Sequence, residues 1–343
     1  MLPTEVFERI IDYCSDEDPQ SLRSCSLVCK DWVTRSRQHL FARHLRLDFN
    51  NTAAFLDLLH GPRCTVKLFL AALEIDLSSY YEQDGCKTLD KLAQAIADEC
   101  TSLRSLALHE ATSPSVLLPF TNLSLSLTTL CLDGSFWGWG PFVSVRAGKI
   151  LDLVGNCSGL EVLSMAYDTP GRAIEDAVSP EYQGEAKKLW LPRLRHLDLD
   201  VVWNAFIPWF LIPGAVSLPS LGKLELFLAV QPMRMETALL QSFLHLVSST
   251  VVDLVICVMW ETIPELDLSS FKALRSVLFR VSSWSSEEVG HHQKIYDIVS
   301  TRPTPHNSEC PLKVIITDDK MEPPYMEGVH WIADEWYYQD HYQ

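Results

Sequence analysis

The sequence lacks any cluster of basic residues, and it lacks long apolar runs. Lys and Arg number 28 against 44 Asp and Glu, which gives a formal net charge of −16. Proteins that bind nucleic acid gather Lys and Arg to contact phosphates, so we expect no nucleic-acid partner. No eighteen consecutive residues are all apolar, and Glu5, Glu8 and Arg9 interrupt the start of the chain. These absences exclude an evident membrane span or signal peptide and predict a cytoplasmic and/or nuclear protein without a membrane partner.

Signals for metal binding and catalysis are also missing. None of the ten cysteines forms a C-x-x-C pair, and no glycine-rich loop could hold a phosphate. Gly155–Gly159 resembles a nucleophile elbow with Cys157 at its centre, but an elbow follows a strand and precedes a helix. Here a helical pattern comes first and a strand pattern follows, which favours a helix-ending turn. We therefore expect a non-catalytic protein with no metal and no cofactor.

The first forty residues instead carry a dense helical pattern. Apolar residues at Val6 and Ile10, with others beside them, recur at the spacing of one helix face. Asp18-Pro19 is typical of a second helix start, and a break near Ser26-Leu27 would divide the apolar residues that follow between two short helices. Three helices this small cannot bury all of these apolar side chains, so the pattern predicts a small module with one face covered by a partner.

The same residues resemble a known docking motif. Leu2-Pro3-x-Glu5-Val6, Ile10, Asp18-Pro19 and Ser26-Leu27-Val28-Cys29-Lys30-x-Trp32 are similar to the F-box, in the form found in fungi. The resemblance implies binding to a Skp-type adaptor and, through it, to the cullin and RING subunits of a ubiquitin ligase. It implies these adaptor-binding residues: Leu2, Pro3, Val6, Ile10, Leu22, Leu27, Val28 and Trp32. The alternative is an ordinary helical cap on a larger domain.

A second pattern, L-x-x-L-x-L, repeats through the rest of the chain. It begins at Leu103, Leu127, Leu160, Leu194, Leu221, Val251 and Leu274, with 24, 33, 34, 27, 30 and 23 residues between successive first positions. Further strands are expected within 43–49, 67–76 and 313–317. Helical patterns lie between strands, at 89–100, 239–247 and 289–299, and this alternation predicts parallel strands joined by helical crossovers.

This spacing resembles the leucine-rich repeat, although the repeat's usual Asn or Cys after the strand is absent. The expected fold class is α/β: a three-helix F-box over residues 1–45, then an irregular leucine-rich-repeat-like solenoid with a parallel sheet over 46–320. Residues 321–343 would form a capping segment, with Val329, Ile332 and Trp336 at helical spacing, or an acidic-aromatic tail. An ordinary α/β domain with a Leu-rich parallel sheet is the alternative.

The positions between the repeat leucines should form the open face of the sheet. Acids outnumber lysine there, which would suit a basic or hydrogen-bond-donating target. Aromatic residues also recur four or five positions after the last apolar residue of a strand. Loops at such an edge often carry recognition, although these rings could equally seal the ends of the core. The predicted target-binding residues are Phe136, Trp137, Asp198, Asp200, Trp203 and Trp260.

Together these patterns predict the substrate receptor of a Skp–cullin–F-box ubiquitin ligase, with an unknown protein target bound by the repeats. The receptor would perform no bond chemistry and would act by holding the target near the charged ubiquitin carrier. One alternative is a scaffold protein that engages the adaptor without directing ubiquitination. The other is an enzyme built on an α/β sheet, which the missing motifs disfavour.

Overall fold

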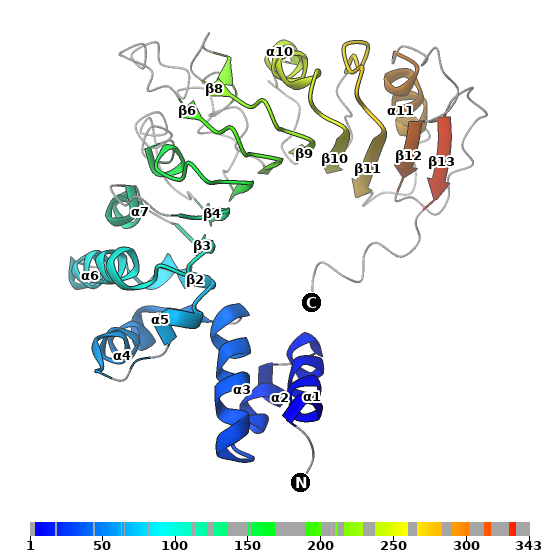
Figure 1. Ribbon diagram of the computed structural model, residues 1–343. Coiled ribbons are helices and arrows are strands. Elements are labelled where there is room, and N and C mark those ends of the chain that lie inside the picture. Colours follow the sequence, from blue (N-terminus) through cyan, green and yellow to red (C-terminus); the bar gives the residue numbers. More distant parts are fainter. Residues whose placement is uncertain are drawn as a thin grey trace. The chain divides into compact units, whose positions relative to one another are not determined.

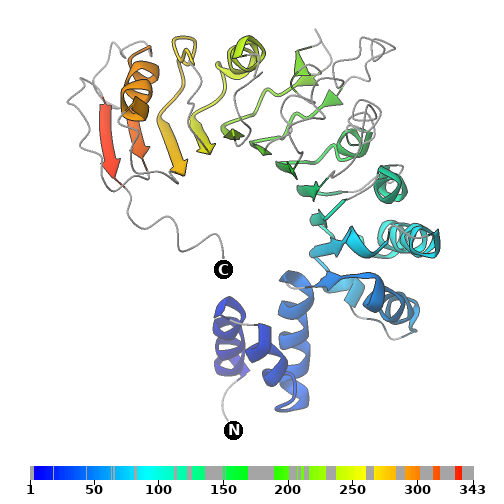
Figure 2. The ribbon, with the colours of Figure 1, turned by 180° about the vertical axis from the view of Figure 1, so that it is seen from behind.

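The computed structural model (Figures 1 and 2) divides the chain into two compact units. Unit 1 contains residues 1–136 and 148–160, and unit 2 contains residues 137–147 and 161–343. The structure describes residues 4–17, 19–43, 45–62, 64, 66–80, 83–111, 114–121, 126–135, 150, 152–168, 189–200, 207, 210–211, 216–228, 237–259, 266–282, 290–301, 312–316 and 329–333.

Unit 1 opens with three helices in mutual contact: α1 (Thr4–Glu17), α2 (Pro19–Cys25) and α3 (Lys30–Arg43). A turn separates the last two, because the Leu27 and Val28 amides donate to the carbonyls of Ser24 and Cys25. The predicted break near Ser26-Leu27 is therefore confirmed. α3 then contacts α5 (Val66–Phe69) and β2 (Ala72–Asp76), which joins the three helices to the rest of unit 1.

The remainder of unit 1 alternates strands with helices. The parallel strands β1 (Arg46–Leu47), β2, β3 (Ser105–His109) and β4 (Thr129–Ser135) are neighbours in chain order. Helices α4 (Phe49–His60), α6 (Gln83–Glu99) and α7 (Pro114–Thr121) lie on one side of these strands (Figure 1), and the short 3₁₀ helix η1 (Leu77–Ser79) follows β2. Parallel strands with helical crossovers are therefore confirmed here.

Unit 2 has the same kind of arrangement within itself. Its sheet has the parallel order β5 (Val162–Asp168), β7 (His196–Asp200), β9 (Lys223–Leu228), β10 (Asp253–Met259), β11 (Ser276–Ser282), β12 (Leu312–Ile316) and β13 (Val329–Ala333). Helix α10 (Thr237–Val247) precedes β10, and α11 (Gly290–Ser300) precedes β12. The short strands β6 (Leu189–Trp190) and β8 (Val216–Ser217) form a separate parallel pair.

The repeat leucines are in register across each sheet. In unit 1, Leu73 pairs with Leu106, and Leu106 with Leu130. In unit 2 the equivalent row is Leu163, Leu197, Leu224, Leu254, Val277 and Val314. All of these side chains are at most 1% exposed. Burying each one stabilises the fold by about 1.5–3 kcal/mol, so a row of them fixes the register of the strands.

Three predicted elements differ from the structure. The strand expected over 43–49 covers only Arg46–Leu47, because Asp48 forms a capping box with Asn51 and starts α4 at the next residue. The segment 67–76 contains most of α5 before β2 begins.

The third difference concerns the C-terminal segment. The helical spacing of Val329 and Ile332 is misleading, since both belong to β13, which pairs in parallel with β12. Pairing gives the facing backbone groups of both strands hydrogen-bond partners, and Trp331 lies in register with the buried Val314. The remaining residues of 321–343 lie outside the described part of the chain.

Candidate functional site

The three-helix module exposes a set of large apolar side chains. Leu27 is 86% exposed and Val28 61%, at the turn before α3. On α1, Val6 is 38% exposed, Ile10 40% and Tyr13 67%. Exposed apolar groups of this size, gathered on a module of three short helices, are typical of a surface that a partner covers. Tyr13 was not among the predicted contact residues, although its position three residues after Ile10 places it on the same helix face.

Other predicted adaptor contacts belong to the module's core. Leu22 is fully buried and clusters with Ile11 and Cys25, so its assignment to a contact surface is wrong. Trp32 is half-buried, packs against the same cluster, and places its ring 5.7 Å from that of Phe7. Trp32 therefore supports the fold as well as presenting part of its ring. Leu2 and Pro3 lie outside the described residues.

A hydrogen-bonded salt bridge connects α1 and α3. Arg35 donates from Nε and Nη2 to the two carboxylate oxygens of Asp12, at 2.8 Å each, and His39 Nε2 lies 2.7 Å from Asp12 Oδ1. The hydrogen bond from Arg35 lowers the pKa of Asp12 to about 2. A bidentate pair fixes both position and rotation, so α1 and α3 present their exposed side chains in one geometry.

In unit 2, the open face of the sheet carries charged residues in consecutive strands. Glu225 of β9 lies opposite Asp198 of β7 in the sheet register. Its Oε1 is 2.6 Å from Lys223 Nζ and 2.9 Å from His196 Nε2. Burial opposes ionisation of Glu225, but these two partners outweigh it and lower the pKa to about 2. Asp198 accepts a 2.8 Å hydrogen bond from Ser164, while burial raises its pKa.

These contacts change the interpretation of the acidic face. Asp253 likewise accepts from the Ser276 hydroxyl at 2.5 Å, so the acids Asp198, Glu225 and Asp253 all have partners within the sheet. A carboxylate with a close internal cation or donor contributes less to an incoming basic target. Beside them lies an apolar cluster of Val255, Cys257 and Leu278 with Phe227, which makes the centre of this face less polar than the sequence indicates.

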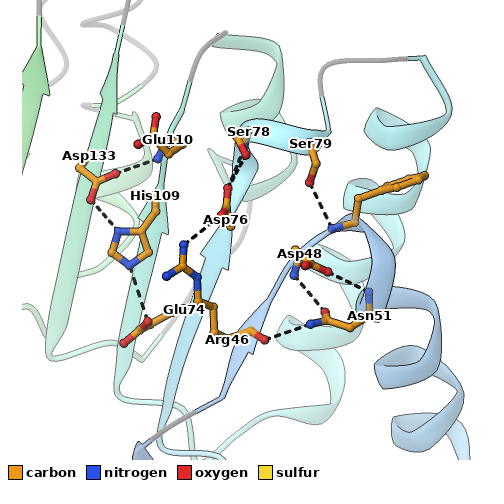
Figure 3. A network of polar contacts seen from close by, with 11 residues as sticks. Arg46, Asp48, Asn51, Glu74, Asp76, Ser78, Ser79, His109, Glu110 and Asp133 are labelled. Atoms are coloured by element: carbon orange, nitrogen blue, oxygen red, sulfur yellow. Dashed lines mark hydrogen bonds and ion pairs between the residues drawn. The ribbon is translucent and has the colours of Figure 1, made fainter.

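Unit 1 holds a comparable polar network, shown in Figure 3. His109 Nδ1 lies 2.6 Å from Asp133 Oδ2, while the Glu110 amide donates to Asp133 Oδ1 at 2.8 Å. Glu110 has a φ of 54°, in the left-handed region, at the point where the chain leaves β3. Next to it, Arg46 Nη2 donates to Asp76 at 2.9 Å. The network joins the ends of neighbouring strands and was not predicted, because its members are far apart in the sequence.

The elbow-like segment is structural in the fold. Residues 152–155 are helical, the Asn156 amide donates to the Asp152 carbonyl at 3.2 Å, and β5 follows. Cys157 is fully buried, and burial raises the pKa of its thiol to about 12. A thiol with that pKa is not a nucleophile at neutral pH. The prediction of a helix-ending turn is therefore confirmed.

Much of the predicted target site falls outside the described residues. Phe136, Trp137, Trp203 and Trp260 all lie there, so their proposed edge stays a prediction. Asp198 and Asp200 are both in β7, but only the side chain of Asp198 is described. Asp198 alternates along the strand with the buried Leu197 and Leu199, which places it on the open face.

Comparisons with known proteins give no relative: no protein-family model matches the chain, and no curated protein matches it significantly. Within the described part of the chain, no helix combines the length and apolar character needed to cross a bilayer. The same residues contain no group of three or more His, Cys, Asp and Glu placed to hold a metal ion.

Proposed function

We propose that this protein is the substrate receptor of a Skp–cullin–F-box ubiquitin ligase and has no catalytic role of its own. One observation carries the proposal. The residues that resemble the F-box fold into three helices, and Val6, Ile10, Leu27 and Val28 expose their apolar side chains there. A Skp-type adaptor with an apolar groove would cover them. In this arrangement the adaptor, the cullin and the RING subunit act in the cytoplasm, the nucleus or both.

The remaining strands would serve as an irregular leucine-rich-repeat-like solenoid that holds a protein target. Support comes from the parallel strands in chain order within each unit and from the aligned buried rows of leucines. The target would contact the open face and the aromatic residues that follow the strands, including Phe136, Trp137, Trp203 and Trp260. The mechanism is proximity, because a held target raises the effective concentration of its lysines near the ubiquitin carrier.

The test is capture of adaptor and cullin by the full chain. Leu27→Asp/Val28→Asp places two carboxylates on the exposed apolar surface without disturbing the core formed by Ile11 and Leu22. Burying an unpaired carboxylate at an interface costs several kcal/mol, so capture should fall about a hundredfold or more. Leu246→Asp, at a residue of α10 that is 49% exposed, places a single carboxylate on an exposed apolar position of unit 2 and should leave capture unchanged.

Two outcomes would count against the proposal. Wild-type strength of capture in the double variant would mean that the three helices do not bind an adaptor. Capture that persists without any change in target lifetime on deletion of the protein would favour the alternative, a scaffold that engages the adaptor without directing ubiquitination.

A further inference from the structure

Cations line one edge of the sheet in unit 2, where the strands begin. Arg195 immediately precedes β7 and Arg275 immediately precedes β11. Backbone hydrogen bonds connect them through the two strands between. The Gly222 amide donates to the Arg195 carbonyl at 2.9 Å, Val252 donates to Gly222 at 2.7 Å, and Arg275 donates to Val252 at 2.8 Å. The two arginines thus occupy equivalent positions on one row, separated by a glycine and a valine.

Three further cations lie close to these two: Arg193 and Lys272 precede them by two and three residues in the chain, and Lys313 pairs with Ser276 in the next strand. We term the five residues the cationic edge: Arg193, Arg195, Lys272, Arg275 and Lys313. All five side chains are exposed, and the Lys313 amide donates directly to the Arg275 carbonyl at 2.9 Å. Among the residues that the structure describes, none forms an ion pair with any of them. Lys223, between them, is already paired with Glu225. Within the described part of the chain, the cationic edge therefore gathers five exposed cations without an ion-pair partner on a chain whose formal net charge is −16.

The described acids near this edge make their close contacts with other groups. Asp253 accepts from the Ser276 hydroxyl at 2.5 Å, and Asp267 accepts from both the amide and the hydroxyl of Ser269 at 2.8 Å. Glu161 ends the row beyond Arg195, to which it is joined through its backbone carbonyl. Among the described residues, none of these three acids forms an ion pair with a cation of the edge, so the arginine side chains keep their donors available for an anionic group at contact distance.

The spacing of the arginines indicates the shape of the ligand. Neighbouring strands lie about 4.8 Å apart, so three steps place the Arg195 and Arg275 backbones about 14 Å apart. An extended peptide that crosses the strands advances about 3.3 Å per residue, and would therefore bring two acids about four residues apart to the two arginines. Gly222 adds no side chain to the row between them, and Val252 offers an apolar contact there.

We propose that the cationic edge binds an extended acidic peptide segment of another protein, with two carboxylates about four residues apart and an apolar residue between them. The net charge of the chain disfavours nucleic acid, because a long polyanion would be repelled by the rest of the molecule. The inference rests on the proposed function in one respect, which is that the acidic segment belongs to the recruited target.

The test is selection of binders from a displayed library of random twelve-residue peptides, with the full chain as bait and no adaptor present. The wild type should enrich acid pairs at this spacing, with affinities that weaken as salt rises. Arg195→Glu/Arg275→Glu should bind the enriched peptides about tenfold or more weakly, whereas Arg195→Lys/Arg275→Lys should retain most of the affinity.

The matched control is Arg37→Glu/Lys91→Glu, which makes the same change in net charge at two exposed helical positions of unit 1. It should bind the enriched peptides as the wild type does. The inference is overturned if the wild type enriches no acid pair, if the reversed variant binds equally well, or if the control loses as much affinity. Binding of single-stranded RNA or anionic vesicles, without peptide binding, would also overturn it. Adaptor capture is measured separately, so its failure would not be mistaken for failure of the cationic edge.

Discussion

His109 shows how a strand-end residue acquires an altered pKa. Its hydrogen bond to Asp133 is the main cause that raises the pKa of the imidazole above 6.5, and partial burial opposes it. A raised folded-state pKa means that protonated His109 stabilises the fold fully below about pH 6.5. This contribution is lost as pH rises through the raised value.

Asp133→Asn should therefore return the imidazole titration of His109 toward its ordinary value. The asparagine side chain can still accept the Glu110 amide through its carbonyl oxygen, so the local backbone should be preserved. Titration of His-labelled full-length protein by NMR measures the midpoint directly. An unchanged midpoint in the variant would show that Asp133 does not set the pKa of His109.

Gly134 meets a different constraint, which is the close approach of another backbone. A Cβ built there would lie 2.6 Å from the Ala111 carbonyl oxygen and 2.9 Å from the Ala111 nitrogen. Gly134→Ala should thus force a backbone shift and cost about 1–3 kcal/mol. Gly222→Ala is the control, because its Cβ would meet nothing nearer than the Arg195 carbonyl oxygen at 3.8 Å. Denaturant unfolding of both variants checks this, and equal stabilities would contradict it.

At the scale of elements, the L-x-x-L-x-L pattern predicted every strand in which it occurs. It succeeds because each leucine in the pattern is buried in register with its neighbours. The pattern does not predict elements whose structure depends on a helix cap or on pairing with the edge of a sheet. Asp48 starts α4 inside a run that alternates like a strand, and β13 forms because β12 offers an edge for its backbone. Neither effect is visible in the hydrophobic periodicity of a single segment.

The helical module separates residues that hold the fold from residues that face outward. Trp32→Ala removes the ring that packs against Phe7 and the core, and should destabilise the module by about 2 kcal/mol, less than the cost at a fully buried site. Leu27→Ala removes a side chain that is 86% exposed and should leave stability nearly unchanged. Hydrogen exchange of the α1 and α3 amides distinguishes the two variants. Equal protection would mean that Trp32 contributes nothing to the fold.

At the scale of the whole molecule, the fold was more predictable than the sites. Hydrophobic periodicity reports burial, and burial fixes both the helical module and the parallel strands. The positions of charged residues in the sequence do not show which of them pair in the fold. The sequence indicates an acidic open face, yet Glu225 forms an ion pair with Lys223 and lies 2.9 Å from His196 Nε2 of the neighbouring strand. These partners come together only through strand pairing, as do Arg195 and Arg275 at the cationic edge.

A buried charge in one strand should destabilise the neighbouring strands more than distant parts of the chain. Leu197 is fully buried at the centre of β7, between Leu163 of β5 and Leu224 of β9. Leu197→Asp buries an unpaired carboxylate there, which should cost several kcal/mol. This cost exceeds the free energy that holds β7 between its two neighbouring strands, if strands contact only their neighbours. Hydrogen exchange should therefore rise in β5, β7 and β9, while the α1–α3 amides keep their protection and the chain still captures the adaptor.

Leu246→Asp supplies the comparison, because it introduces the same carboxylate at an exposed position of unit 2. It should leave exchange in these strands unchanged. If Leu197→Asp instead removed protection equally from α1–α3 and from every strand, the chain would unfold as one cooperative block. An array with neighbour-only contacts would then be excluded, because in such an array the cost of a buried charge falls mainly on the strands that touch it.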